Sequence, residues 1–154
     1  MPQIIKSLTA AHYTAAGALF KEYAQWLGID LCFQQFDDEL AQLPIMYGEP
    51  NGGIFLLKDD IQYIGCVGVR TKEPGIAELK RMYIQPAYHG KGLGQLLLQE
   101  AIALATTIGF TKIRLDTLAT MTPAIGLYKK NGFYEIPPYY FNPEANAVFF
   151  EKLL

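Results

Sequence analysis

A glycine-rich loop between two regular elements constrains this chain more than any other stretch. Residues 89–94 read HGKGLG, after an apolar strand pattern at 76–84 and just before an apolar helical stripe. The first amides of a helix have no partner inside the helix, and the helix dipole adds positive potential there. Glycines also allow close approach to the backbone. The loop therefore predicts either a tight structural turn or an anion site at a strand-to-helix junction.

Two familiar phosphate-binding patterns do not fit this loop. The P-loop pattern GxxxxGK[ST] is absent from the chain. The dinucleotide pattern GxGxxG also fails. Its sixth position is Gln95 when the pattern starts at Gly90, and Leu97 when it starts at Gly92. Nucleotide binding of either common kind is therefore disfavoured.

The whole chain, residues 1–154, is expected to form one mixed α/β domain, because its length suits a single core. Glycines, prolines and changes of hydrophobic period mark the elements. The first half is expected to form a strand near 3–8, a helix capped by Thr9 and ended by Gly28, a short helix at 35–43 stopped by Pro44, and a hairpin that turns at Asp59-Asp60. A strand at 76–84 and a long helix ended by Gly109 should follow. The chain should then form a strand from Lys112, a helix with Thr122 as cap and Pro123 in its first turn, and extended structure from Phe133.

Composition narrows the partners. The formal net charge of −2 does not indicate a nucleic-acid-binding surface, and no apolar run reaches membrane-spanning length. Cys32 and Cys66 do not form a CxxC pair, so a reduced, cytoplasmic protein is expected. With His12 and His89 as the only histidines, no metal site is expected either.

The loop and its surroundings resemble the GNAT N-acetyltransferases. Residues 89–94 follow the family's motif A, [QR]xxGx[GA], and ELKRMYIQPAYHGKGLGQLLL resembles its fourth strand, pyrophosphate loop and third helix. Downstream, AIGLYKKNGF resembles the family's A..LYxxxGF segment. The resemblance covers nearly the whole chain. It implies a mostly antiparallel, twisted sheet of about seven strands, split in a V between strands 4 and 5, with about four flanking helices.

The same resemblance implies where acetyl-CoA binds. Its pantetheine arm would lie in the split and pair with the backbone of Met82, Tyr83 and Ile84, in the manner of an added strand. Its pyrophosphate would lie on the amides of the glycine loop. The implied loop residues are His89, Gly90, Lys91, Gly92, Leu93, Gly94 and Gln95.

Two positions depart from the family pattern. His89 stands where the motif has Gln or Arg, and a neutral histidine offers less charge to a phosphate than arginine. Met121 stands where many members have an asparagine that bonds the cofactor arm. Binding through backbone amides does not depend on either side chain.

Transfer to an amine requires an acid for the leaving sulfur and a base for the amine. Tyr128 matches the family tyrosine that donates to the sulfur, although it also suits a core position on a helix. Glu78 lies eleven residues before His89, the spacing of the family's general-base glutamate. A salt bridge from Glu78 to Lys80 or Arg70 fits equally well, and many relatives use water chains instead. Weaker candidates are Asp116, Glu22 and Tyr139.

The acceptor is less constrained. Aromatic and acidic residues cluster in the two segments that build the family's acceptor pocket, which suits a small cationic amine. Alternatively, the aromatics pack the helices and the acids face water. These residues are Tyr23, Trp26, Phe33, Phe36, Tyr139 and Tyr140, with Glu22, Asp37, Asp38 and Glu39.

The expected function is an acetyl-CoA-dependent N-acetyltransferase acting on a primary amine of a small molecule or peptide. The alternative is a non-catalytic module of the same fold that binds or senses acyl-CoA. The sequence does not determine the oligomeric state, and a homodimer is suggested only by analogy with relatives, which are often dimers.

Overall fold

A computed structural model describes residues 2–31 and 35–154. Within them, seven strands form one sheet in the order β1-β2-β3-β4-β5-β7-β6. Cys32 and Phe33, which the sequence analysis included among the cysteines and acceptor-site aromatics, lie outside the described residues. The strands are β1 (Gln3–Lys6), β2 (Gly53–Asp59), β3 (Gln62–Glu73), β4 (Ile76–Ile84), β5 (Lys112–Leu118), β6 (Tyr134–Ile136) and β7 (Ala147–Leu153).

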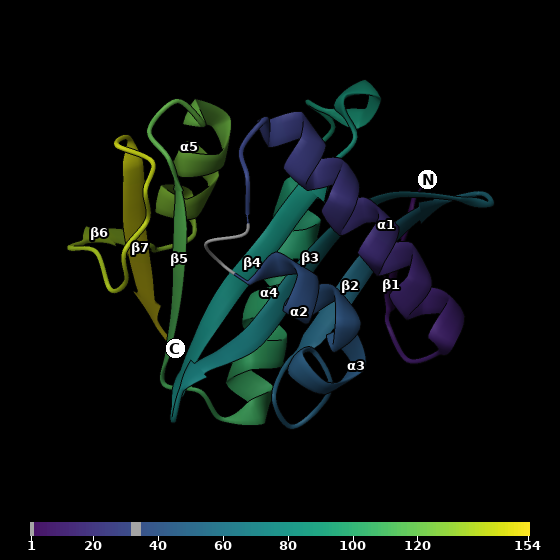
Figure 1. The fold of residues 1–154 in the computed structure, drawn as a ribbon, viewed down its shortest axis with the longest axis horizontal. Coiled ribbons are helices and arrows are strands. Elements are labelled where there is room, and N and C mark those ends of the chain that lie inside the picture. Colours follow the sequence, from purple (N-terminus) through teal and green to yellow (C-terminus); the bar gives the residue numbers. More distant parts are fainter. Residues whose placement is uncertain (1, 32–34) are drawn as a thin grey trace.

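Helices cover both faces of the sheet (Figure 1). On one face lie α1 (Ala10–Leu27), α2 (Phe36–Ala41) and α3 (Leu43–Met46). On the other lie α4 (Leu93–Ile108) and α5 (Thr122–Lys130), while a 3-10 turn, Pro86–Tyr88, leads into the glycine loop. All strand neighbours are antiparallel except β4 and β5. The mixed α/β fold predicted from the family resemblance is confirmed.

The ends of α1 follow from local chemistry. The Thr9 hydroxyl accepts from the amide of His12 at 3.2 Å, and the His12 ring accepts from the amide of Thr9 at 3.3 Å. This reciprocal cap satisfies donors that the helix leaves free. At the other end, Gly28 adopts the left-handed conformation, with φ of 71°. Both predicted limits are confirmed.

Two helix boundaries differ from the sequence prediction. The expected helix at 35–43 is two short helices, and Pro44 lies in the first turn of the second instead of stopping the first. Proline is tolerated there because the first-turn amides need no partner inside the helix. Similarly, Met121, and not Thr122, is the cap residue of α5, and no side chain bonds at that cap.

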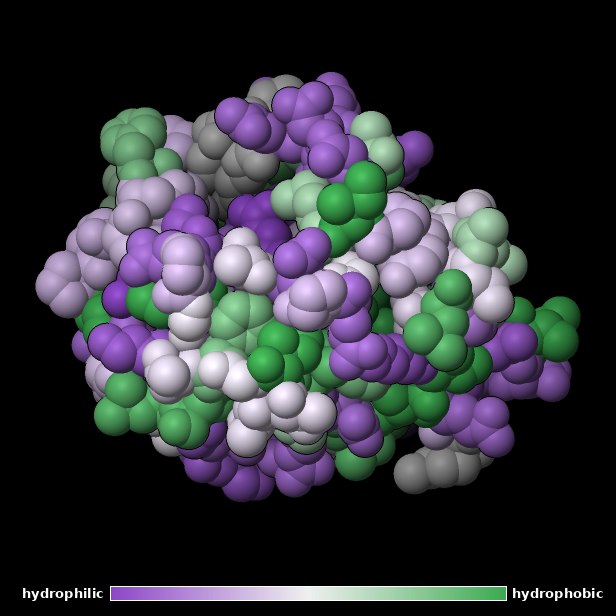
Figure 2. Space-filling view, turned by 90° about the horizontal axis from the view of Figure 1, so that it is seen from below, coloured by the Kyte–Doolittle hydropathy of each residue, from purple (hydrophilic) through white to green (hydrophobic). Residues whose placement is uncertain are grey.

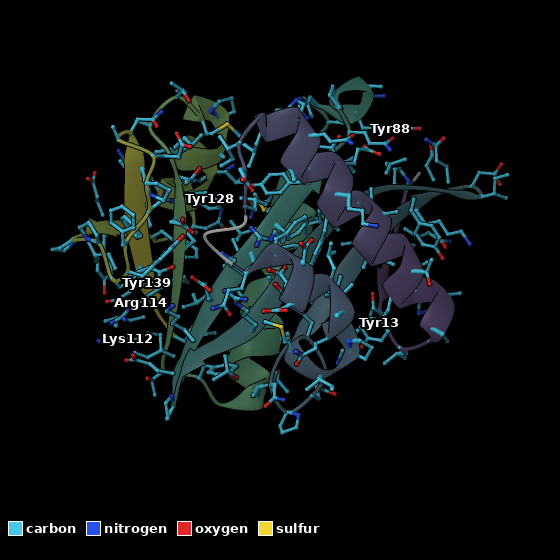
Figure 3. The ribbon with its side chains drawn as sticks, in the orientation of Figure 1. Tyr13, Tyr88, Lys112, Arg114, Tyr128 and Tyr139 are labelled. Carbon is cyan, nitrogen blue, oxygen red and sulfur yellow. The ribbon has the colours of Figure 1, made fainter. Side chains whose placement is uncertain are left out.

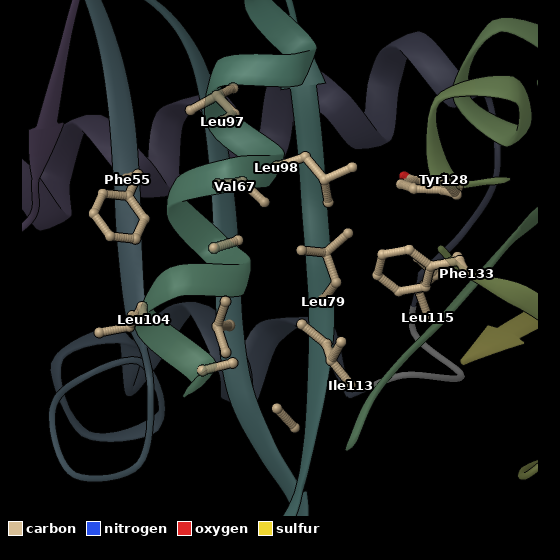
Figure 4. Close-up of a cluster of buried hydrophobic side chains, with 14 of the residues drawn as sticks. Phe55, Val67, Leu79, Leu97, Leu98, Leu104, Ile113, Leu115, Tyr128 and Phe133 are labelled. Atoms are coloured by element: carbon tan, nitrogen blue, oxygen red, sulfur yellow. The ribbon is translucent and has the colours of Figure 1, made fainter. Parts of the chain in front are cut away.

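Two apolar clusters hold the helices to the sheet. The larger one packs leucines of α4 against β2, β3 and β4, with Phe133 and Tyr128 closing it beside α5 (Figure 4). The smaller one packs α1 and α3 on the opposite face, around Phe20 and Tyr47. Each fully buried leucine or phenylalanine contributes about 1.5–3 kcal/mol. The sheet is therefore fixed from both sides before any polar contact is considered.

A β-bulge bends β4 in its middle. Lys80 pairs with Gly68 and Tyr83 pairs with Cys66, so two residues of β4 lie opposite one residue of β3. Arg81, in the bulge, has a φ of 57°. The bulge breaks the alternation of side chains, so the consecutive side chains of Lys80 and Arg81 both lie on the α2 side of the sheet.

The bulge is held by a buried ion pair. The guanidinium of Arg81 donates to both carboxylate oxygens of Glu39 in α2, at 2.7 and 3.2 Å, and lies over the ring of Phe36. The Tyr47 hydroxyl donates to the same carboxylate at 2.8 Å. A left-handed conformation costs a non-glycine residue about 1–3 kcal/mol and persists only where its surroundings over-determine it. Here the ion pair provides that constraint.

Just before the bulge, β4 and β5 separate. Their parallel pairing covers Ile76–Glu78 of β4 against Lys112–Arg114 of β5 and ends there. The two strands meet at one end and diverge toward the other, where α5 and the start of α4 lie (Figure 1). This is the V-shaped split that the family resemblance implied.

Replacing Glu39 by glutamine should destabilise the fold by about 3–5 kcal/mol, because the buried Arg81 charge loses its counterion. Denaturant unfolding monitored by circular dichroism would measure this change. Asp37→Asn, in the exposed first turn of the same helix, is the matched control, with an expected cost within about 1 kcal/mol. Equal stability of the two variants would contradict the anchoring role of Glu39.

Candidate active site

The three loop glycines do two different things. Gly90 and Gly92 have φ of 78° and 76°, and a Cβ on either would meet nothing within 4 Å. They are needed for backbone conformation, and they leave open space in front of the loop. Gly94 is a packing residue, because a Cβ there would lie 3.3 Å from the Leu127 side chain. In the part of the chain that the structure describes, no side chain makes a capping hydrogen bond at the start of α4, so its first amides have no side-chain partner there.

The unusual His89 ties the loop to β4. Its Nε2 atom lies 2.7 Å from the carbonyl oxygen of Ile84, so the ring donates from that nitrogen. The ring also packs edge-on against Trp26 of α1, with centroids 6.0 Å apart. His89 thus supports the loop by a hydrogen bond to the chain. Its departure from Gln or Arg does not remove the backbone cradle.

A reciprocal amide pair joins α4 to α5. The side chain of Gln95 donates to Asn131 at 2.9 Å and accepts from it at 2.8 Å. Asn131 also donates to the carbonyl of Leu127. Each amide thereby satisfies its partner's donor and acceptor. The start of α4 and the end of α5 are held at a fixed separation.

The far half of β4 offers a backbone edge to the split. Tyr83 and Ile84 pair with β3 on one side. On the other side, no described strand pairs with Met82, Tyr83 or Ile84, since the pairing with β5 ends at Glu78. The amides and carbonyls of an unpaired edge can accept an extended ligand as an additional strand. The bond from His89 to Ile84 joins this edge to the glycine loop, and cofactor binding by Met82, Tyr83 and Ile84 stays a prediction.

Tyr128 lies on α5 at the other wall of the split. Its ring is 6% exposed and packs against Phe133 and Phe150. In Figure 4 its oxygen points away from α5 toward β4. Burial raises the pKa of the Tyr128 phenol, and the nearby Tyr23 and Asp116 raise it further. The hydroxyl therefore keeps its proton at neutral pH.

Glu78 is buried in hydrogen bonds. One carboxylate oxygen accepts from Arg70 at 3.0 Å, and the other accepts from the Tyr139 hydroxyl at 2.6 Å. Burial raises the pKa of Glu78, but the charges of Lys80 and Arg70 and the bond from Tyr139 outweigh it, so the pKa is lowered. The salt bridge to Arg70, one of the sequence alternatives, is present. The role of Glu78 as general base stays a prediction.

Lys80 is a site residue that the sequence analysis named only as a partner for Glu78. Its side chain lines both pockets of the site, and its ammonium lies 4.0 Å from Asp116. Burial lowers the pKa of Lys80 to about 8, against the opposing effect of Glu78. Two adjacent charged residues, Lys80 and Arg81, inside an apolar strand are the sequence signal that would have indicated the bulge and both cations.

Two pockets open beside Lys80. The smaller, of about 40 Å³, lies where β4 and β5 diverge, with Asp116, Leu118 and Met121 in its wall. The larger, of about 480 Å³, lies under α2 with Arg70 and Lys72 in its wall. Figure 2 shows a hollow with strongly hydrophilic residues at its floor.

The acids expected beside the acceptor do not form an acidic pocket. Glu39 is bonded to Arg81, while Glu22 accepts from Tyr83 at 2.7 Å. Asp37 and Asp38 are exposed on α2. The aromatics divide into two groups as well. Tyr23 and Trp26 of α1 pack with Tyr83. Tyr139 and Tyr140 instead pack edge-on against Phe149 of β7, and the guanidinium of Arg114 lies over the Tyr139 ring (Figure 3).

Comparison of the sequence with known protein families identifies the family of this chain. The profile of the Acetyltransferase (GNAT) family matches residues 16–133. The chain belongs to this family. Among curated GNAT relatives, an uncharacterized N-acetyltransferase of Schizosaccharomyces pombe is 43% identical over 133 residues, covering 85% of this chain and 82% of the relative. An IAA acetyltransferase of Azospirillum brasilense is 31% identical and covers all of both chains.

Solved GNAT structures share the fold. An acetyltransferase from Streptococcus agalactiae matches with a TM-score of 0.81 and 22% identity, over 99% of this chain and 98% of that one. The PaiA N-acetyltransferase from Thermoplasma acidophilum, solved in complex with coenzyme A, matches with a TM-score of 0.75 and 22% identity, over 100% and 99%. At these identities the likeness is one of fold.

Neither a metal centre nor a membrane span is found among the residues that the structure describes. No group of three or more histidine, cysteine, aspartate or glutamate side chains there is arranged to hold a metal ion. None of the helices in this part of the chain has the length and apolar character to cross a bilayer.

The lowered pKa of Lys80 predicts a distinct dependence of stability on pH. Between about pH 8 and the ordinary value of 10.5, the folded state binds fewer protons at Lys80 than the unfolded state does. The free energy of unfolding should therefore rise through this window, by about 3 kcal/mol. Lys80→Met should lack the rise. Denaturant unfolding of both proteins across the pH range measures this rise. The tyrosines titrate in both proteins, so the difference in unfolding free energy between them reports Lys80. A difference that does not change with pH would contradict the lowered pKa of Lys80.

Proposed function

We propose that this GNAT chain is an acetyl-CoA-dependent N-acetyltransferase that acts on a primary amine of a small molecule or peptide. One observation carries the proposal: β4 has a backbone edge that no described strand pairs with, between an open, glycine-rich helix start and the buried Tyr128. A structural neighbour solved with coenzyme A supports the choice of cofactor. When bound, acetyl-CoA supplies an activated thioester.

The residues of the split fit coenzyme A. The bare backbone at Gly90 and Gly92, together with the first amides of α4 through Gln95, suits a pyrophosphate. Lys91, over the ring of Tyr88, adds a positive charge beside it. The backbone of Met82–Ile84 suits a pantetheine arm, and one of its amides would polarise the thioester carbonyl.

Tyr128 would act as the acid. Its phenol stays protonated at neutral pH because burial raises its pKa, and its oxygen faces the split. A proton held there would be available at the sulfur as the thiolate leaves. If Tyr128 had only a packing role, a phenylalanine would fill the same place in this apolar cluster.

For the proton of the acceptor amine we propose a joint role for Lys80 and Glu78. A pKa of about 8 makes neutral Lys80 a proton acceptor suited to neutral pH, whereas the lowered pKa of Glu78 makes that carboxylate a weak base. Two positions apart on the same strand face, Glu78 would stabilise the ammonium once Lys80 is protonated. The pH series on stability measures the pKa on which this role depends.

An acetylation assay tests the function. The protein is supplied with acetyl-CoA and a panel of amines, and release of the CoA thiol is measured together with mass spectrometry of the acetylated product. Transfer to an amine supports an enzyme. Calorimetric binding of acetyl-CoA with no transfer to any amine would instead indicate the alternative, a non-catalytic acyl-CoA-binding module. The named acceptors of relatives differ, as in the IAA acetyltransferase and an N-acetylaspartate synthetase, so those names do not select one.

Tyr128→Phe should lower kcat at least about 100-fold, because the acid is lost while the ring still packs. The dissociation constant for CoA, measured by calorimetry, should change less than about threefold. Tyr134→Phe is the matched control, since that tyrosine lies on β6 and bonds Glu151 away from the split. Full activity of Tyr128→Phe would refute the acid assignment.

His89→Ala should weaken CoA binding by about 3- to 10-fold, because the loop loses one hydrogen bond worth about 1 kcal/mol. His89→Gln restores a donor and should recover most of the affinity. Titration calorimetry with CoA measures both. His12→Ala, which alters the cap of α1, is the control for removing an imidazole. Unchanged affinity in His89→Ala would mean that the loop needs no tether.

A further inference from the structure

The charged side chains around the larger pocket indicate which class of acceptor it would bind. This inference rests on the proposed transferase function. This pocket, of about 480 Å³, lies between α2 and the strands β3 and β4. That volume suits a small molecule. Cations and carboxylates both line it. The charged lining residues are Asp38, Glu39, Arg70, Lys72, Glu78 and Lys80.

The buried carboxylates of this pocket are already engaged. Both oxygens of Glu39 receive donors from Arg81, and Tyr47 bonds one of them. Both oxygens of Glu78 receive donors, from Arg70 and Tyr139. Arg81 and Arg70 already balance the charges of these two carboxylates, so a cationic ligand would gain little from either of them. The interior of the pocket is therefore not an ammonium-binding site of the kind that its acids alone would indicate.

Lys72 is the lining cation that differs. It is half-buried on β3, and its ammonium lies 5.5 Å from the centroid of the Tyr139 ring and 5.0 Å from that of Tyr140. Within the described ranges, 2–31 and 35–154, no carboxylate forms a salt bridge with it. Arg70 and Lys80, by contrast, both lie within salt-bridge distance of a carboxylate.

The aromatic platform under Lys72 is fixed in place. The hydroxyl of Tyr139 donates to Glu78, and the hydroxyl of Tyr140 donates to Asp116. The two rings also contact each other, with centroids 5.4 Å apart. A cation held over fixed rings is pre-organised, so binding an anion there requires little further ordering of the side chain.

The other cations beside this pocket each have a carboxylate close by. Arg81 pairs with Glu39, Arg70 pairs with Glu78, and Lys80 lies 4.0 Å from the half-buried Asp116. The fourth carboxylate, Asp38, is exposed at the mouth on α2. Lys72, half-buried at the pocket, is the lining cation that forms no salt bridge among the described residues, so a ligand that brings a negative charge would supply its missing partner.

We propose that the acceptor carries a carboxylate as well as its amine, so that it belongs to the class of amino acids. Lys72 binds the carboxylate, and the amine lies toward Lys80, whose side chain also borders the split between β4 and β5. A charge-assisted contact between ammonium and carboxylate is stronger than a neutral hydrogen bond. It gives the site a basis for preferring amino acids over simple amines and over diamines.

Matched pairs of acceptors test the proposal. Glycine, β-alanine and 4-aminobutyrate are compared with methylamine, ethylamine and propylamine, which lack only the carboxylate, and L-leucine is compared with isopentylamine. For at least one pair we expect kcat/KM to be at least about tenfold higher for the amino acid. The pair with the largest ratio reports the spacing between amine and carboxylate. Equal rates within every pair, or a preference for cadaverine over all the amino acids, would overturn the proposal while the transferase function stands.

Lys72→Met removes the charge and keeps the length of the side chain. The ratio of kcat/KM between amino acid and amine should fall at least about tenfold in this variant, and Lys72→Arg should restore part of it. Lys58→Met is the matched control, because Lys58 also lies over a tyrosine ring, that of Tyr63, outside the lining of this pocket. It should leave the ratio unchanged. An unchanged ratio in Lys72→Met would overturn the role of Lys72.

A binding measurement separates this proposal from the proposed function. Calorimetry with the CoA-loaded protein and the same amino acids should detect binding that Lys72→Met weakens at least about fivefold. Such binding without any acetyl transfer would refute the enzyme and retain the carboxylate site. Transfer to amines with no dependence of amino-acid binding on Lys72 would retain the enzyme and refute the carboxylate site.

Discussion

The buried ion pair between Arg81 and Glu39 sets the shape of β4, and the site depends on that shape. The pair holds a non-glycine residue in a left-handed conformation at the bulge. The bulge follows closely on the end of the pairing with β5 at Glu78, beyond which no described strand pairs with this edge of β4. The bulge also places Lys80 on the same face as Arg81. The interaction between α2 and β4 thus fixes the backbone at the wall of the split and the position of the charges there.

The buried polar groups on the α2 side contribute little net stability to the fold. Desolvating two charges costs several kcal/mol per ion, and a buried ion pair recovers this only with good geometry and additional hydrogen bonds. The site meets that condition: Tyr47 and Arg70 complete the bonding of Glu39, and Tyr139 completes that of Glu78. Stability comes mainly from the two apolar clusters, while the polar network fixes the positions of groups that chemistry would use.

Local sequence signals predicted the elements and the loop well, because glycines and caps act within a few residues. Gly28 and Gly109 end their helices in the left-handed conformation, and the glycine loop lies where strand meets helix. The partner of the bulge, Glu39, could not be found this way. Glu39 and Arg81 are 42 residues apart, and no local pattern couples them. The sequence pattern placed Pro44 at a helix end, whereas it lies in the first turn of α3, because proline is compatible with both positions.

The contact between α4 and α5 has a mechanical consequence. Gly94 lets the two helices approach closely, and Gln95 and Asn131 then hold them by two hydrogen bonds. The loop amides are at the start of α4, and Tyr128 is one turn before Asn131 on α5. The loop amides and the Tyr128 phenol are therefore carried by two helices that are tied to each other directly, and not only through the sheet.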